Sequence, residues 1–364
     1  MEFKKLNILY IATNITGGGG VARILSQKTA AFVQSGHCVQ IVSTNEQKQT
    51  PFYAFDAQVN FVFYTASVRT FPKMKRYYSF IKNEVVAQFK PDVIFVIDNG
   101  IKGYFASYYL NKTIPIYFEV HGSRNFLLTP IQSKLKRNLV NRITLFLSTR
   151  FTGLILLNES TKKDWKHANI SVIPNWIEID QTKSISCVNK EKKIIAIGRL
   201  VPEKNYETLL KIWKQIQVVN PDWQLVICGS GEPAYVEKLK TTTDASVIWK
   251  GEVEEVNQEL ESSVFMLHTS KMEGMPMAFL EAMALEIPIL AFDVPYGPSD
   301  LIQDGHTGYL IPFENQQKMI ACSLLLMNHP ALCKSLGQQA KEAVQAYDKS
   351  LVLQQWITFF ESLD

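Results

Sequence analysis

Short apolar runs alternate with amphipathic stretches along most of the chain. The runs predict buried strands at residues 6–11, 39–42, 59–63, 93–97, 116–120, 154–157, 194–197, 223–228, 247–249 and 264–267. Between them, apolar side chains recur at helical spacing, as Ile24, Ala31 and Phe32 do after the first run. Strands that alternate with helices predict parallel sheets. The pattern therefore predicts an α/β protein, and 364 residues are enough for two such domains.

Composition suggests where these domains end. We predict a first domain at residues 1–176, a polar, lysine-bearing linker at 177–192 and a second domain at 193–348. Residues 349–364 form a separate C-terminal helix in this prediction. Its apolar stripe consists of Leu353, Trp356, Ile357 and Phe360, and such a stripe needs a surface to pack against.

The stretch from Ser270 to Ala284 holds the strongest candidate chemistry. It follows the apolar run at 264–267, and Pro276 stands where a helix accepts a residue without an N–H group, at its first turn. Glu273 and Gly274 would then lie between the carboxyl end of a strand and the amino end of a helix, where open α/β sheets bind anions. Glu281 lies further along the same helix. These residues alone leave open that Glu273 only favours the helix dipole and that Glu281 is a solvated surface residue.

The wider segment resembles a known family. Two glutamates eight positions apart, in Glu-Gly-Met-Pro at 273–276 and Glu-Ala-Met-Ala at 281–284, resemble the paired-glutamate motif of the nucleotide-sugar glycosyltransferases of family four. The segments at 296–302 and 304–312 are similar to those that come after the motif in that family. The resemblance implies a GT-B fold, in which two Rossmann-like domains face each other across a cleft and the second mainly holds the donor. It also implies that the C-terminal helix packs back on the first domain.

The same resemblance assigns roles to the motif residues. Glu273 would bind hydroxyls of the donor sugar and Glu281 the ribose, and the loop between them would complete the donor site through Gly274, Met275, Pro276 and Met277. The run Gly-Arg-Leu at 198–200, followed by Glu-Lys-Asn at 203–205, matches the family's diphosphate-binding loop. Arg199 and Lys204 would grip the diphosphate there, one as a fork and one as a point charge. A charged loop that merely faces water is the alternative.

Three further segments fit the family. Glycines at 17–20, between a strand and a helix, let the backbone approach a ligand closely, so Gly18, Gly19 and Gly20 would face the diphosphate and sugar, although a plain tight turn is possible. His121 ends a predicted strand in Glu-Val-His-Gly and would contact the transferred sugar, although a lone histidine there is often structural. Gly251 and Val253 lie in the segment whose backbone would bind the nucleobase.

Two positions depart from the family's pattern. Trp176 replaces the usual glycine in Pro-Asn-Gly, which makes a left-handed backbone conformation doubtful there. Glu286 stands at a helix C-terminus where the family commonly has glycine, and it opposes the helix dipole mildly.

The expected reaction develops negative charge on a departing diphosphate and oxocarbenium character on the sugar, so fixed donors and cations are needed. No Asp-x-Asp occurs in the sequence, so we expect metal-independent transfer with no cofactor, and the two cations would replace the metal. The family's transfer retains anomeric configuration. We expect a UDP-sugar as donor. The sequence does not itself specify the nucleobase, because main-chain hydrogen bonds to a base leave no side-chain signature.

Charge and apolar content bear on partners and location. The five cysteines are scattered without a C-x-x-C, no segment resembles a signal peptide, and no apolar stretch nears the ~20 residues that span a bilayer, so we expect a cytoplasmic protein.

Residues 1–180 carry 22 Lys and Arg against 11 Asp and Glu, which suggests that this half meets an anionic surface or substrate. Segments 69–78 and 134–146 combine cations with apolar residues. The second forms a stripe of Leu135, Leu139, Ile143 and Phe146, which either packs on its own core or meets an anionic inner-membrane surface.

The sequence thus predicts a retaining glycosyltransferase that acts on a cell-envelope glycan or a lipid-linked acceptor, with no nucleic-acid partner. A nucleotide-sugar 2-epimerase or a phosphorylase of the same architecture is an alternative. A nicotinamide-dependent oxidoreductase fits less well, because the acidic residue expected after the second strand is poorly matched. An alternative from another class of protein is a non-catalytic subunit that binds a partner glycosyltransferase.

Overall fold

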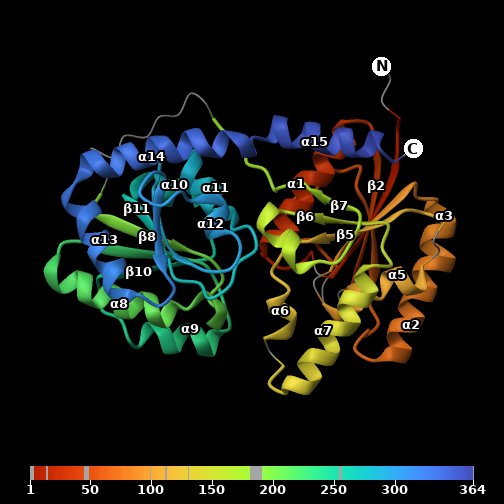
Figure 1. The fold of residues 1–364 in the computed structure, drawn as a ribbon, viewed down its shortest axis with the longest axis horizontal. Helices are drawn as coiled ribbons and strands as arrows, with labels where there is room; N and C mark the ends of the chain where they lie inside the picture. The colour runs from red at the N-terminus through yellow and green to blue at the C-terminus, as the bar shows by residue number, and fades with distance from the viewer. Residues whose placement is uncertain are drawn as a thin grey trace. The chain divides into compact units, whose positions relative to one another are not determined.

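A computed structural model describes residues 4–363 except 14, 45–48, 99, 111–112, 130, 181–190 and 254–255. The chain divides into two compact units, each with its own parallel sheet (Figure 1). Unit 1 comprises residues 1–174 and 353–364, and unit 2 comprises residues 175–352. Most of the linker predicted at 177–192 lies outside the described residues.

The described part of unit 1 forms a seven-stranded sheet in the order β3-β2-β1-β4-β5-β6-β7. Its strands are β1 (Asn7–Ala12), β2 (Cys38–Thr44), β3 (Asn60–Tyr64), β4 (Val93–Ile97), β5 (Ile116–Val120), β6 (Gly153–Leu156) and β7 (Ile170–Val172). Its helices are α1 (Gly20–Gln34), α2 (Phe71–Phe80), α3 (Ala87–Phe89), α4 (Ile101–Tyr104), α5 (Ala106–Tyr109), α6 (Asn125–Leu128) and α7 (Lys134–Ser148), and the greater part of α15 (Lys349–Glu361) joins them.

Aromatic side chains join α15 to α1 and to the sheet of unit 1. The ring of Phe32 on α1 meets Trp356 and Phe360 of α15 edge-on, with centroids 5.4 and 5.0 Å apart. Phe95 of β4 meets Trp356 at 5.7 Å. Figure 1 shows α15 beside α1. The apolar stripe of the last helix therefore lies against unit 1.

The described part of unit 2 forms a six-stranded sheet in the order β10-β9-β8-β11-β12-β13. Its strands are β8 (Lys193–Ile197), β9 (Gln224–Cys228), β10 (Val247–Gly251), β11 (Phe265–His268), β12 (Ile289–Asp293) and β13 (Gly308–Pro312). Its helices are α8 (Tyr206–Val219), α9 (Pro233–Lys240), α10 (Val256–Ser262), α11 (Met277–Ala284), α12 (Pro298–Leu301), α13 (Gln316–Asn328) and α14 (Pro330–Val344). The two parallel, helix-flanked sheets confirm the predicted pair of Rossmann-like domains.

The strand order reverses once in each sheet. In unit 1 the reversal lies between β1 and β4, and in unit 2 it lies between β8 and β11. Loops that follow two such strands diverge to opposite faces of the sheet and leave a crevice at the strands' carboxyl ends, where open α/β sheets bind ligands. The fold therefore directs attention to the segments after these four strands.

The structure makes two local predictions more definite. Helix α11 begins at Met277, and Pro276, predicted at the first turn, is its N-cap residue. Of the two alternatives for the stripe on α7, packing on the core applies only to Ile143, because Leu135, Leu139 and Phe146 are exposed. Lysines and arginines flank these apolar positions of α7, and the cost of burying their charges favours the outward orientation of its first turns.

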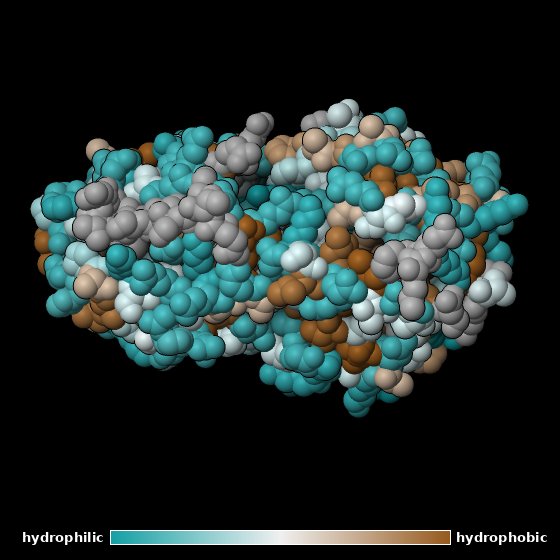
Figure 2. Space-filling model, turned by 90° about the horizontal axis from the view of Figure 1, so that it is seen from above, coloured by the Kyte–Doolittle hydropathy of each residue, from teal (hydrophilic) through white to brown (hydrophobic). Residues whose placement is uncertain are grey.

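No single helix in the described part of the chain has both the length and the apolar composition to cross a membrane. One bent pair, at 316–328 and 330–347, meets that test by length and composition when the two helices are taken together. On the face drawn in Figure 2, hydrophilic residues cover most of the surface and hydrophobic residues form smaller patches among them.

Candidate functional site

A buried glutamate lies at the strand reversal of unit 2. Glu273 follows β11, and its Oε1 atom accepts a hydrogen bond from Lys204 Nζ at 2.6 Å. The Nε2 atom of His268, the last residue of β11, lies 2.6 Å from the same oxygen. Lys204 comes from the loop after β8, the neighbouring strand. The sheet order therefore brings together two motif residues that are 69 positions apart in the chain.

The local backbone places Glu273 at this point. Gly297, with φ of 86°, packs against the loop, and a Cβ atom there would lie 2.7 Å from the carbonyl oxygen of Gly274. Asp300 accepts a hydrogen bond from the amide of Gly297 at 2.9 Å and fixes that turn. The amide of Asn175 donates to Met275 Sδ at 3.4 Å. Only glycine fits at position 297, which explains in physical terms why the Tyr-Gly-Pro-Ser run accompanies the glutamate loop.

The electrostatics keep Glu273 ionised. Burial by itself would raise the pKa of Glu273, but Lys204 and then His268 lower it well below its usual range. Burial lowers the pKa of His268, against the opposing effect of Glu273. The side chain of Lys204 is 19% exposed, whereas that of Glu273 is 5% exposed. The cluster is therefore a neutral imidazole and a lysine on one carboxylate, and the lysine side chain is partly exposed to solvent.

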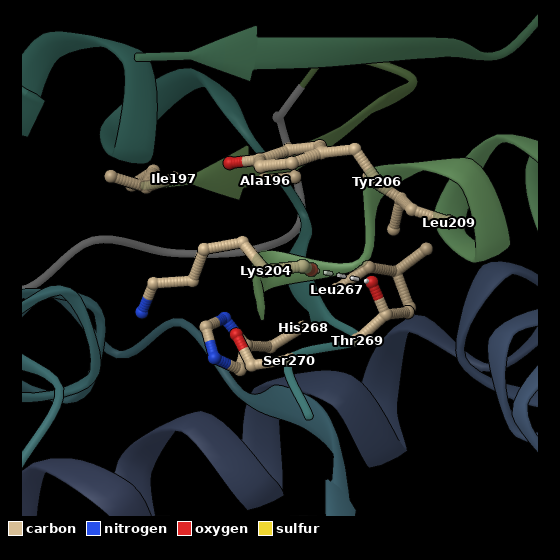
Figure 3. A pocket seen from close by; sticks show the side chains of 9 residues that line it. All are labelled: Ala196, Ile197, Lys204, Tyr206, Leu209, Leu267, His268, Thr269 and Ser270. Atoms are coloured by element: carbon tan, nitrogen blue, oxygen red, sulfur yellow. Dashed lines mark hydrogen bonds between the residues drawn. The ribbon is translucent and has the colours of Figure 1, made fainter. Parts of the chain in front are cut away.

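A small recess beside this cluster extends towards the sheet (Figure 3). It is lined by Ala196, Ile197, Lys204, Tyr206, Leu209, Leu267, His268, Thr269 and Ser270. In Figure 3 the aliphatic chain of Lys204 is drawn between the ring of Tyr206 and the imidazole of His268. Thr269 Oγ1 donates to the main-chain oxygens of Lys204 and Asn205, at 3.4 and 3.1 Å. These bonds fix the turn that carries Lys204 to the carboxyl end of β11.

The other residues of unit 2 that were predicted to bind the sugar donor differ in their exposure to solvent. Arg199 is exposed, and within the described residues its guanidinium has no hydrogen-bond or ion-pair partner. Glu281 lies in the second turn of α11 and is 4% exposed, so it is not the solvated surface residue of the alternative interpretation. Gly251 ends β10 with φ of 72°, a conformation that favours glycine, and Val253 follows it half-buried. Pro276, the N-cap of α11, is buried, and Met277 after it is half-buried.

Unit 1 holds a second cluster of the same composition. His121 Nε2 lies 3.0 Å from Oε2 of Glu119, the buried acid two residues before it. Lys28 of α1 pairs with the same oxygen, and Tyr10 of β1 donates to Oε1 of Glu119 at 3.0 Å. The ammonium of Lys28 lies 4.7 Å from the ring centroid of Trp356 on α15. The carboxylate of Glu119 is therefore held by Lys28 from α1, by Tyr10 from β1 and by His121, which follows β5.

The glycine segment leaves space at the start of α1. Gly19 is the N-cap of α1 and Gly20 is its first residue, with no side-chain cap on the helix N-terminus. A Cβ atom at either glycine would meet nothing within 4 Å. Tyr53 donates to the carbonyl of Gly18 at 3.0 Å and fixes the preceding turn. Local packing does not require glycine at 19 or 20, so these positions leave room for a ligand to approach the helix N-terminus.

Sequence reasoning missed three residues of the two clusters: Lys28, Glu119 and His268. Glu119 and His268 were visible as polar residues within or at the end of apolar strands, where an unpaired charge would be costly. Lys28 gave no comparable signal, because lysine is ordinary in an amphipathic helix. In the described part of the chain, no three His, Cys, Asp or Glu side chains gather in a way that could hold a metal ion.

Two family models match this chain, one in each half. Residues 179–343 match the family model described as glycosyl transferases group 1, and residues 18–181 match the one described as Glycosyltransferase Family 4. An uncharacterized glycosyltransferase of Haemophilus influenzae is 27% identical over 95% of this chain and 98% of its own length. The amylovoran biosynthesis glycosyltransferase AmsD of Erwinia amylovora is 25% identical over 96% of this chain and 98% of its own.

Solved structures share the fold at low identity. Anabaena HepE in complex with UDP and glucose superposes with a TM-score of 0.75 and 16% identity, over 98% of this chain and 100% of that one. Staphylococcus aureus TarM, in complex with Fondaparinux, alpha-GlcNAc-glycerol and UDP, gives a TM-score of 0.75 and 16% identity over 97% and 99%. These neighbours confirm the predicted GT-B fold.

Proposed function

We propose that this chain, which belongs to the family-four glycosyltransferases and has the GT-B fold, transfers a sugar from a UDP-sugar to a bacterial cell-envelope glycan, with retention of anomeric configuration. The names of its relatives support the acceptor class: AmsD acts in amylovoran biosynthesis, and a Staphylococcus aureus relative, 29% identical over 59% of this chain, is a poly(ribitol-phosphate) alpha-N-acetylglucosaminyltransferase. Neighbouring structures in complex with UDP support the donor class.

The observation that carries this proposal is the Lys204–Glu273 pair at the strand reversal of unit 2. Charge builds on the departing diphosphate during transfer, so a cation that solvent can reach is suited to receive it. Lys204 meets that requirement, and exposed Arg199 lies five residues before it in the same loop. Glu273 is ionised and able to accept hydroxyl hydrogen bonds from a sugar. Glu281, buried on the helix behind the loop, is assigned to the ribose.

Transfer should not need a metal ion. The two cations of the loop after β8 would offset the diphosphate charge that a divalent metal offsets in other transferases. We expect activity to survive excess EDTA. Complete loss that Mg²⁺ or Mn²⁺ restores would contradict this part of the proposal.

On the acceptor side, we propose that α7 meets an anionic membrane surface or a lipid-linked acceptor. Leu135, Leu139 and Phe146 are exposed on this helix, and Lys134, Lys136, Arg137 and Arg142 are exposed beside them. Apolar side chains combined with cations suit an anionic interface. Sedimentation with anionic vesicles tests this, and a Leu135→Asp/Leu139→Asp variant should bind them more weakly, whereas neutral vesicles should bind neither protein.

A donor panel tests the proposed function as a whole. Each nucleotide-sugar is first tested for thermal stabilisation of the protein and then for hydrolysis. The anomeric configuration of the released sugar is compared with that of the donor. The proposal expects one UDP-sugar to stabilise the protein and to be hydrolysed slowly with UDP release. An epimerised nucleotide-sugar as product would assign a 2-epimerase instead, and the absence of any nucleotide binding would favour a non-catalytic subunit.

A further inference from the structure

His268 makes a close and rigid contact with Glu273. Its Nε2 atom lies 2.6 Å from Glu273 Oε1, and its side chain is 6% exposed. The ring of Phe279, on α11, meets the imidazole edge-on at 83°, with centroids 4.8 Å apart. The imidazole is therefore fixed from the strand on one side and from the helix on the other.

The chemistry of the contact determines which group donates. Glu273 is ionised and can only accept, so the Nε2 atom of His268 must carry the proton. Burial lowers the pKa of His268, which keeps the imidazole neutral. It thus donates to the carboxylate without adding a second positive charge beside Lys204. Both bonds end on Oε1, so Oε2 of Glu273 takes neither of them.

The two partners of Glu273 differ in mobility. Lys204 is a flexible side chain that solvent reaches, and the proposed function assigns it to the diphosphate. A lysine that turns towards a phosphate weakens its bond to Glu273. His268 is confined by its burial and by Phe279, so its bond does not depend on where Lys204 points.

We propose that His268 is a positioning residue for sugar transfer, which holds the Glu273 carboxylate in place while Lys204 engages the diphosphate of the donor. This inference rests on the proposed role of Glu273 towards the donor sugar. His268 itself touches neither the nucleotide nor the sugar in this assignment.

The test compares two substitutions of the full chain. His268→Leu removes the donor, and His268→Gln keeps an N–H near the position of Nε2. We expect His268→Leu to lower kcat for hydrolysis of the UDP-sugar about 10- to 100-fold, the scale of one lost hydrogen bond to a charged group. His268→Gln should recover most of that loss. The Kd for UDP should stay within about twofold of wild type in both, because UDP carries no sugar for Glu273 to hold.

A double-substitution cycle separates positioning from simple support of the fold. If His268 acts through Glu273, His268→Leu should cost less than about twofold in a Glu273→Gln background, because no carboxylate is left to position. His37→Leu is the matched control: His37 is a buried histidine of unit 1 that accepts from the amide of Leu6 at 3.2 Å. It should change the melting temperature and leave kcat of the folded protein unchanged.

Three outcomes would overturn the inference. Wild-type kcat in His268→Leu would do so, as would an equal loss of kcat in the wild-type and Glu273→Gln backgrounds, or a loss of UDP affinity that parallels the loss of kcat. Each leaves the donor assignment of unit 2 intact. A wild-type protein that binds no UDP and turns over no UDP-sugar would instead overturn the proposed function, and this inference with it.

Discussion

In the described part of each unit, a buried glutamate is bonded to both a lysine and a histidine. The clusters are Lys28–Glu119–His121 in unit 1 and Lys204–Glu273–His268 in unit 2. Their composition is the same, but their access to water differs. The side chain of Lys28 is 4% exposed and lies under the ring of Trp356, whereas that of Lys204 is 19% exposed. A lysine enclosed by aromatic rings can pair only with its carboxylate, whereas a partly exposed lysine can also bind a ligand.

The pKa values of the two glutamates are lowered by the same kinds of partner, a lysine and a histidine. Burial would raise the pKa of Glu119, but Lys28 and then His121 lower it to about 2. Burial lowers the pKa of Lys28, in opposition to Glu119. Each ion of this pair therefore needs the other, because a lone charge in that position has no water to solvate it. The comparison teaches that two clusters of one composition can differ in how far solvent reaches their lysine.

The largest effect should come from breaking the enclosed pair. Lys28→Met leaves Glu119 charged and without its ammonium partner in apolar surroundings, and breaking a buried ion pair costs about 3–5 kcal/mol. We expect that loss in the free energy of unfolding, measured in urea. The double variant Lys28→Met/Glu119→Gln should recover most of it, because no charge is left uncompensated. A double variant as unstable as the single one would contradict this account of unit 1.

The same substitution in unit 2 should affect turnover rather than stability. The side chain of Lys204 is 19% exposed and that of Lys28 only 4%, so the loss of stability in Lys204→Met should be smaller than that in Lys28→Met. We expect kcat to fall about 10²–10³-fold, as when one preorganised charge stabiliser is removed. Arg199→Ala should give a similar fall with an unchanged melting temperature, because that side chain is exposed. Wild-type turnover in either variant would remove the diphosphate assignment.

Much of this comparison could not be predicted from the sequence. Spacing and apolar runs predict the two α/β domains, and the motif loop predicts Lys204 and Glu273, because both depend on local patterns. The ion pair of Lys28 and Glu119 joins residues 91 positions apart, and no local pattern encodes such a contact. The strands β7, β12 and β13 were not predicted either. The apolar run of β12 follows α11 after a short turn, so its pattern merges with that of the helix.

The two departures from the family's pattern have different structural outcomes. Glu286 has φ of 58°, a left-handed conformation that costs a residue other than glycine roughly 1 kcal/mol, which explains why glycine is common there. Lys341 pairs with Glu286 at 3.2 Å and offsets part of that cost. Trp176 is not among the described residues with positive φ, and its side chain is buried. The position of Trp176 therefore has no requirement for glycine.

A smaller effect should distinguish the two motif glutamates of unit 2. Glu273 is assigned to the sugar, where charge changes during the reaction, and Glu281 to the ribose, which stays the same throughout. Glu273→Gln should mainly lower kcat, and Glu281→Gln should mainly raise the KM for donor. UDP should bind Glu281→Gln more weakly by about 1–3 kcal/mol, the scale of one hydrogen bond to a charged group, and Glu273→Gln nearly as well as wild type. Calorimetric titration with UDP measures both values, and equal weakening would mean that the roles are misassigned.

The smallest effect, a pH dependence of stability, should appear in both clusters alike. Burial is the main cause that lowers the pKa of His121 and of His268 below the usual 6.5, so both stay neutral in the folded chain. As pH falls through about 6.5, the unfolded chain takes up protons at these histidines and the folded chain does not. Acidification therefore favours unfolding, with a limiting slope of about 1.4 kcal/mol per pH unit for each such proton.

The lowered pKa values of the glutamates act in the same direction, but only below about 4.5, so histidines dominate between pH 5.5 and 7.5. Burial also lowers the pKa of His37, which adds to the slope of the wild type, so the cluster histidines are read from the change in slope of each variant. We expect the free energy of unfolding of the wild type to fall across this range. His268→Gln should reduce the slope of unfolding free energy against pH by the contribution of one proton, and His121→Gln should reduce it by the same amount. A wild-type stability that stays flat from pH 7.5 to 5.5 would show that neither imidazole is held neutral. A change in slope for one variant alone would show that the two clusters differ in more than the exposure of their lysines.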